Sequence, residues 1–201
     1  MSMKSQHGAG LIEALVAILV LSIGLLGMLG MQTAALRYEQ SSWIRGALSI
    51  NFGSLADRVR ANSSALETAY SNTGTYAAER AAIEADPAFF TPTTDCDTAS
   101  CTAAQLAVYD MLIWRRELNS QLPGAAGFIV PSGTKGIDLR FLVTVAWFDK
   151  DNANTAGTAL SSPAICTAAT AGIASRNCCP SALGTASALS GVRCANLELV
   201  P

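Results

Sequence analysis

LIEALVAILVLSIGLLGMLGM, residues 11–31, is the stretch of this 201-residue sequence that decides the fold. Its only charged residue is Glu13, and from Ala14 to Met31 its only clearly polar residue is Ser22. A helix of about 20 residues crosses the ~30 Å hydrocarbon layer of a bilayer. A cleaved secretory signal has an apolar core of only about 7–15 residues, and a helix in a soluble core usually shows a periodic polar side. The stretch therefore predicts a membrane-spanning helix.

The carboxylate of Glu13, inside this apolar stretch, needs an explanation. An acidic side chain at the centre of a bilayer costs about 2.5–3.5 kcal/mol on insertion scales, and less near the interface. Glu13 could lie at the headgroup level, where the N-terminal dipole of the helix favours it. It could instead have a specific partner inside the apolar environment. The residue alone leaves both interpretations open.

The segment HGAGLIEALV, residues 7–16, resembles the N-terminal motif of the type IV prepilins. In that family a short polar leader ends in glycine and a prepilin peptidase cuts after it. The new N-terminal residue, usually Phe, is N-methylated, and the fifth mature residue is Glu. The resemblance implies cleavage between Gly8 and Ala9, N-methylation of Ala9, and a role for Glu13 in subunit registration. Ala9 departs from the usual Phe.

The continuation VLSIGLLGMLGMQ, residues 20–32, looks like one branch of this family, the PilV minor pilins. That branch implies a structural subunit that helps to initiate a type IV pilus, and hence twitching motility and adhesion. The implied partners are other minor pilins, the major pilin, the prepilin peptidase, the inner-membrane assembly machinery and a tip adhesin. A minor pseudopilin of type II secretion would share the leader and Glu13. A single-pass anchor with a periplasmic binding domain would not be cut after Gly8.

Cleavage would give Glu13 a chemical partner. The α-amino group exposed at Ala9 would have a pKa of about 8, so it would be mostly protonated at neutral pH. Glu13 of one subunit could then pair with the amine of its neighbour inside an apolar filament core. A buried charge is tolerated when it is paired and strongly penalised when it is alone. We therefore expect this pair to set axial register more than to add net stability.

Beyond the apolar stretch, the helix is predicted to continue to residue 62 and to pack one face on a globular head. The chain then divides into a leader (1–8), a transmembrane and filament-core helix (9–31), an amphipathic continuation (32–62) and a periplasmic head (63–201). The apolar residues of the continuation recur at steps that place them on one helix face. They are Leu36, Ile44, Leu48, Phe52, Leu55 and Val59.

The head is predicted to be α+β, with a short helix and a small antiparallel sheet beside the long helix. Residues 65–101 contain helix breakers and are expected to be irregular. A capping box at Thr102–Gln105 predicts the start of a second helix, which Pro123-Gly124 would end. Residues 149–190, rich in Ala, Ser, Thr and Asn, are expected to form a loop linked by cysteines. Strands are expected at 128–130, 139–148 and 196–200.

The cysteines lie in the second half of the chain, and their even number predicts disulfides and an oxidising compartment. Neighbouring Cα atoms are only about 3.8 Å apart, so the adjacent Cys178 and Cys179 should not pair with each other. Cys96 with Cys101 is the preferred local pair. The other two partners would take Cys178 and Cys179 in an order that the sequence leaves open. The six are Cys96, Cys101, Cys166, Cys178, Cys179 and Cys194.

Composition argues against several functions. The net charge of −2 and the lack of a basic block give no source for nucleic-acid binding. The only histidine, His7, falls in the expected leader, so the mature chain would lack the commonest general base and the histidine that zinc sites often use. We expect no catalytic residues, no metal and no cofactor.

The location follows from the same features. We expect a single pass through the inner membrane with the N-terminus cytoplasmic and the head periplasmic, followed by incorporation into a surface pilus. Lys4 precedes the span, whereas Arg37 and Arg45 follow it, and this count alone would favour the opposite orientation. Large domains translocate largely regardless of charge, and the cysteines favour the oxidising side.

Overall fold

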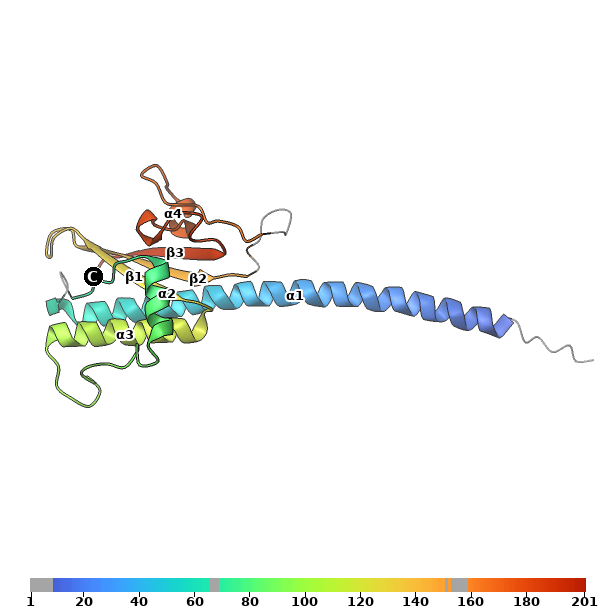
Figure 1. The fold of residues 1–201 in the computed structure, drawn as a ribbon, viewed down its shortest axis with the longest axis horizontal. Helices are drawn as coiled ribbons and strands as arrows, with labels where there is room; N and C mark the ends of the chain where they lie inside the picture. The colour runs from blue at the N-terminus through green and yellow to red at the C-terminus, as the bar shows by residue number, and fades with distance from the viewer. Residues whose placement is uncertain (1–8, 66–68, 151, 153–158) are drawn as a thin grey trace, which may run out of the picture. The chain divides into compact units, whose positions relative to one another are not determined.

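The computed structural model describes residues 9–65, 69–150, 152 and 159–201, so the expected leader, including Gly8, lies outside the described residues. The chain forms two compact units that divide between Arg45 and Gly46. Helix α1, Ala9–Ala61, supplies the first unit and enters the second (Figure 1). A long N-terminal helix followed by a small α+β head is the predicted fold class, and it is confirmed.

Within the head, α1 presents a slightly rotated face compared with the predicted one. Leu55 and Val59 are buried as expected, but Leu48 and Phe52 are only half-buried, while Ala47 and Asn51 face the core. Asn51 can be buried because its Nδ2 donates to the carbonyl of Ala47 (2.7 Å) and to Oε1 of Gln121 (2.8 Å). A helix face predicted from the spacing of apolar residues alone does not include a buried asparagine such as this one.

The sheet has three antiparallel strands in the order β1-β2-β3. They are β1 (Ala126–Ser132), β2 (Arg140–Phe148) and β3 (Val192–Leu199). The prediction for β2 was right to within one residue. The predictions for the other two were too short, because β1 extends beyond 128–130 at both ends and β3 begins four residues before Asn196.

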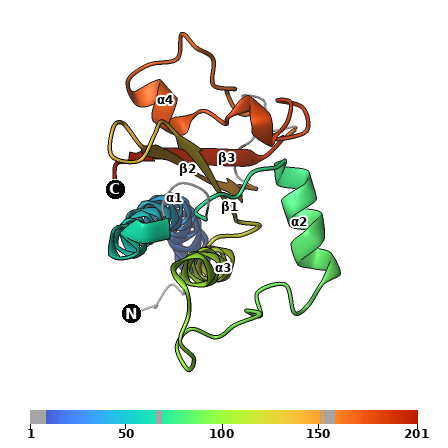
Figure 2. The same cartoon turned by 90° about the vertical axis from the view of Figure 1, so that its left-hand side faces the viewer.

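Both faces of this sheet are covered. The predicted alternation on β2 is confirmed, since Phe141, Val143, Val145 and Trp147 are all buried. They share the face on which Gly127, paired with Val145, approaches Trp114 of α3. Thr144 and Ala146, between them, are buried as well, beneath the segment that contains α4 (Figure 2). Antiparallel sheets often leave one face to solvent. In this head that second face is covered instead by the cysteine-linked segment, which forms a third layer.

Helix α3, Ala103–Gln121, begins where the sequence predicted. The Oγ1 of Thr102 accepts from the backbone of Gln105, and the side chain of Gln105 accepts from the backbone of Thr102, so the capping box is complete. The buried face of α3 carries Trp114 and Leu118, and Trp114 Nε1 donates to the carbonyl of Asn51 (3.1 Å). This pair joins α3 to the head portion of α1.

The prediction that residues 65–101 are irregular was wrong in part, because helix α2 spans Tyr76–Ala85. Thr75 caps it, with its Oγ1 accepting from the backbone of Ala78 at 3.2 Å. The helix fully buries none of its residues. Half-buried Tyr76 packs against the core, and Glu79 forms an ion pair with Arg115 of α3. The helix is short but amphipathic and begins at a capping threonine, so the sequence did carry a local signal for it that the prediction passed over.

A buried polar cluster fastens the head portion of α1 to α3. Asp110, which is buried, accepts from Arg58 Nη1 at 3.0 Å and from the hydroxyl of Tyr70 at 2.7 Å. Asn62 donates to the same hydroxyl (3.3 Å) and to the carbonyl of Ala103 (2.7 Å). Burial, followed by the hydrogen bond to Asp110, raises the pKa of Tyr70 far above its ordinary value. The phenol is therefore neutral in the folded head.

Candidate functional site

The first unit of the chain exposes a continuous apolar surface. Between Leu11 and Met31, every large apolar side chain of α1 is between 54% and 77% exposed. Among the described residues, α1 is the one helix long and apolar enough to span a membrane. A surface of this kind is stable only when lipid or other apolar helices cover it. This part of α1 is therefore the region of the chain that most needs an external partner.

Glu13 lies within this surface, and it is exposed. It makes no hydrogen bond or ion pair with any residue in the described part of the chain. It is the fifth residue of α1, which starts at Ala9, so it lies about 6 Å along the axis from the helix start. The positive end of the helix dipole favours a carboxylate there, but a charge-bearing partner must come from outside the described chain.

Three glycines interrupt the same surface. A Cβ added to Gly24, Gly27 or Gly30 would meet nothing within 4 Å. The fold of this chain therefore does not require glycine at any of these positions, although glycine costs about 1 kcal/mol relative to alanine in a helix. Small residues in apolar helices allow close helix–helix approach. The glycines are thus consistent with a surface that packs against other helices.

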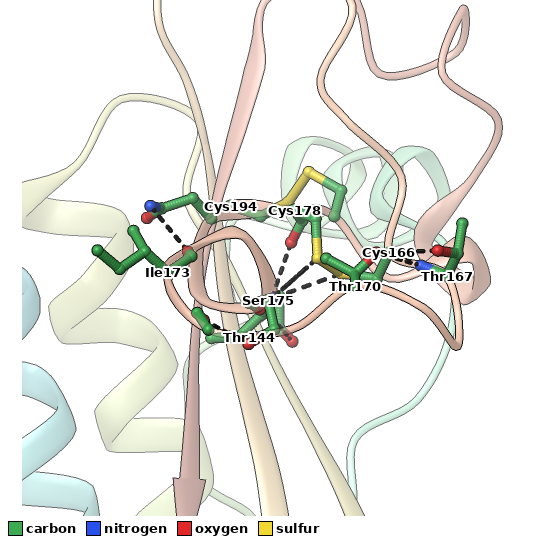
Figure 3. The surroundings of a disulfide bond; sticks show 12 residues. Thr144, Cys166, Thr167, Thr170, Ile173, Ser175, Cys178 and Cys194 are labelled. Carbon is green, nitrogen blue, oxygen red and sulfur yellow. Dashed lines mark hydrogen bonds between the residues drawn. A yellow bond between two sulfur atoms is a disulfide. The ribbon is translucent and has the colours of Figure 1, made fainter.

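In the head, the structure joins all six cysteines in three disulfides. Cys96 pairs with Cys101, and the two adjacent cysteines take separate partners: Cys178 bonds Cys166, and Cys179 bonds Cys194 of β3 (Figure 3). The order that the sequence left open is thereby assigned. Helix α4 (Ile173–Asn177) and a 3-10 turn at Ser181–Leu183 lie in the segment that was expected to be a loop.

The cysteine-linked segment is also hydrogen-bonded to the sheet and to itself. The side-chain amide of Asn196 on β3 donates to the carbonyls of Ser175 and Cys178, both at 2.8 Å. The backbone of Cys166 donates to the carbonyl of Cys179 at 2.9 Å. Leu183 and Leu189 from this segment pack with Phe128 and Ala146 in an apolar cluster. The segment is therefore a packed layer.

The head also contains a groove that the sequence did not predict. It has a volume of about 360 Å³ and lies between the loop at Pro92 and the outer side of α3, where Val108, Tyr109 and Leu112 line it. The hydroxyl of Tyr109 donates to Asp97 at 2.6 Å, and this bond raises the pKa of Tyr109 to about 12. Within the described residues, no cluster of three or more His, Cys, Asp or Glu is arranged to hold a metal ion.

The N-terminal sequence has a known counterpart. Residues 3–29 match the prokaryotic N-terminal methylation motif. The match covers most of the expected leader, the Gly8–Ala9 bond, Glu13 and most of the exposed apolar surface, but it does not reach the head. No curated protein and no solved structure matches the chain significantly.

The motif supports a subunit of the type IV pilin or pseudopilin family. It implies processing by a prepilin peptidase, anchoring in a membrane by the apolar helix, and assembly with other pilins into a pilus-like filament. Proteins that carry it are structural subunits. The motif is common to pilins and pseudopilins, so it does not distinguish the PilV branch.

Proposed function

We propose that this chain is a minor pilin of a type IV pilus that helps to initiate pilus assembly. The observation that carries the proposal is the exposed apolar surface of α1 with an unpaired Glu13, in a segment that matches the methylation motif. The surface supports insertion first into a membrane and then into a helical filament core, since both environments cover apolar side chains.

The proposed life cycle follows the four segments of the chain. The leader, residues 1–8, is removed by the prepilin peptidase at the Gly8–Ala9 bond, and Ala9 is N-methylated. The helix of residues 9–31 holds the subunit in the inner membrane, with its N-terminus cytoplasmic. Its continuation, 32–62, carries the periplasmic head, 63–201, and the assembly machinery transfers the subunit to the growing filament.

Glu13 is proposed to register the subunit axially. After cleavage, the chain's own Ala9 amine and the amines of neighbouring subunits are the cations available in an apolar core. A carboxylate in that environment is strongly penalised unless it is paired. An axial position that brings Glu13 to a neighbour's amine relieves the penalty between subunits, so the charge favours that arrangement among many apolar ones.

A minor role is supported by the head rather than by the helix. Residues 159–190, between β2 and β3, form an additional layer over the sheet that is fastened by two disulfides. A large, idiosyncratic layer suits a subunit present in few copies, because helical repetition does not then constrain every surface. The proposed partners are other minor pilins, the major pilin and a tip adhesin.

The test is a gene deletion combined with analysis of the tagged protein. We expect the deletion to reduce surface pili and twitching sharply while the major subunit remains in the membrane. Intact mass of the membrane form should show loss of Met1 to Gly8, and the tagged protein should occur in sheared pili. Normal pili with lost type II secretion would assign the chain to the pseudopilins instead. Retention of the leader in piliated cells would refute both filament roles.

A further inference from the structure

The adjacent cysteines define two disulfide frameworks that differ only by an exchange of partners. In the structure, Cys166 bonds Cys178 and Cys194 bonds Cys179. The backbone of Cys166, however, lies directly beside Cys179, to whose carbonyl it donates at 2.9 Å. The exchanged framework, with Cys166 bonded to Cys179 and Cys194 to Cys178, therefore requires only that the two adjacent side chains swap sides.

We propose that maturation of the head requires a thiol–disulfide isomerase, because the unfolded chain does not distinguish these two frameworks. The native bonds close loops with sequence separations of 12 and 15 residues. The exchanged bonds would close loops that are each one residue longer. Loop-closure probability falls roughly as the −3/2 power of loop length, so the native framework is favoured by only about 1.2-fold before folding.

The folded head, by contrast, strongly distinguishes the two frameworks. Cys179 is fully buried and packs with Leu183 and Leu189 in the apolar cluster over the sheet. The backbone at Cys178 is extended, with φ −83° and ψ 156°, so successive side chains point to opposite sides. Exchanging the partners would turn Cys179 away from the cluster and disrupt its packing. The native framework is thus the stable one, although oxidation of the unfolded chain does not select it.

The layer has little structure that could guide pairing before its bonds form. Its regular elements are a five-residue helix, α4, and a three-residue 3-10 turn. Isolated helices of this length are not stable in water. Once the exchanged framework has formed, none of these four cysteines retains a thiol to attack the wrong bonds, so the isomer is trapped until an external thiolate opens one of them.

A single catalytic thiolate is sufficient to correct the pairing without net oxidation. It attacks the sulfur of Cys179 in the wrong Cys166–Cys179 bond, forming a mixed disulfide and releasing the Cys166 thiolate. That thiolate attacks Cys178 in the Cys178–Cys194 bond, forms the native Cys166–Cys178 bond and releases the Cys194 thiolate. Finally, Cys194 attacks Cys179 in the mixed disulfide, which forms the second native bond and regenerates the enzyme thiolate.

The inference depends on export of the head to an oxidising compartment, and not on the pilin role. The experiment is oxidation of the reduced full-length chain in detergent micelles by a thiol-free oxidant such as diamide, followed by incubation with or without a catalytic amount of reduced protein disulfide isomerase. No Lys or Arg lies between Cys178 and Cys179, so the two frameworks give tryptic products of equal mass. They are therefore assigned by electron-transfer fragmentation between the two residues.

We expect both frameworks without the isomerase, within about twofold of each other, and the native one alone when the isomerase is present. The paired variant Cys96→Ser/Cys101→Ser should show the same mixture, because that local bond is independent. Cys166→Ser/Cys178→Ser leaves only Cys179 for Cys194, so its bond formation should not respond to the isomerase. Formation of the native framework alone, at the same rate without the isomerase, would overturn the proposal.

Discussion

At the scale of single residues, the function proposed for α1 depends on one carboxylate, that of Glu13. Glu13 has no partner within the described residues, and it lies among side chains that are mostly exposed and apolar. An intramembrane acid is costly to keep. The proposed function explains it, since assembly would supply the cation that the isolated subunit lacks.

Substitution of Glu13 tests this explanation. Glu13→Ala should lower incorporation of the tagged subunit into sheared pili by more than tenfold while export and cleavage continue, because loss of one partner of a buried pair costs about 3–5 kcal/mol. Glu13→Asp should have a smaller effect, since it keeps the charge and shortens the reach. Glu39→Ala is the matched control on an exposed part of α1. Equal incorporation of Glu13→Ala and the unmodified subunit would exclude the registering role.

Tyr70 gives the head a defined dependence on pH. Its pKa is raised in the folded state, chiefly by burial and then by the hydrogen bond to Asp110. A group whose folded pKa is raised contributes stability that is complete below its unfolded pKa, about 10, and is lost as the pH rises above it. We expect the denaturant midpoint to fall between pH 9 and pH 11.5.

The variant Tyr70→Phe isolates this contribution. It should be less stable than the parent at pH 8, because Asp110 loses a hydrogen bond of 2.7 Å. It should also lose less stability than the parent between pH 9 and pH 11.5, since it no longer has the phenol that ionises. If the denaturant midpoints of the two proteins fell in parallel with pH, when followed by circular dichroism, Tyr70 would not control alkaline unfolding.

At the scale of elements, the sequence predicted those that show a periodic apolar pattern or a capping motif. Helix α1, the start of α3 and strand β2 fall in this group. Helix α2 is an exception, because it is amphipathic and capped by Thr75 but was missed when the prolines that follow it led to an irregular prediction for the whole segment. Its position could not be predicted, because the contacts that fix it, such as the Glu79–Arg115 ion pair, join residues distant in sequence. The order of pairing at Cys178 and Cys179 was equally inaccessible, because it depends on which side of the layer faces the sheet.

Two glycine substitutions in the head are expected to have opposite effects on its stability. One lies at the contact between α3 and β1, and the other lies on the exposed side of α1. A Cβ at Gly127 would lie 2.4 Å from Trp114 Cζ3 and 2.9 Å from Leu118 Cδ1. Gly127→Ala should therefore destabilise the head by about 1–3 kcal/mol, the usual cost of overpacking. Gly53→Ala in α1 meets nothing within 4 Å and should stabilise it by up to about 1 kcal/mol. Urea unfolding of the full-length chain in micelles measures both, and a stabilised Gly127→Ala would show that the interface is loosely packed.

At the scale of the whole molecule, the chain divides its tasks between two units with opposite solvent requirements. The unit that ends at Arg45 has an exposed apolar surface and the methylation motif. The unit that begins at Gly46 has its own buried core, the sheet and all three disulfides. A shared helix, α1, covalently joins them. The exposed apolar surface could therefore be predicted from the sequence, because it is one continuous run of apolar residues. The core of the head was harder to predict, because it is formed by residues that are distant in the sequence.

This division predicts that the head folds without the first 45 residues. The portion of α1 that remains is held by Leu55 and Val59 in the core and by the Arg58–Asp110 ion pair at 3.0 Å. A chain of residues 46–201, exported to the periplasm, should be soluble and form the same three disulfides. Its melting temperature should lie within a few degrees of that of the head in the full-length protein, because the deleted apolar residues contribute no side chain to its core. The dispersion of the fragment's amide resonances and its disulfide map provide the measurement.

Leu55→Asp in the same fragment is the matched control and should abolish folding, since it buries an unpaired charge. A collapsed fragment without dispersed resonances would mean that the apolar unit is needed to fold the head as well as to anchor it.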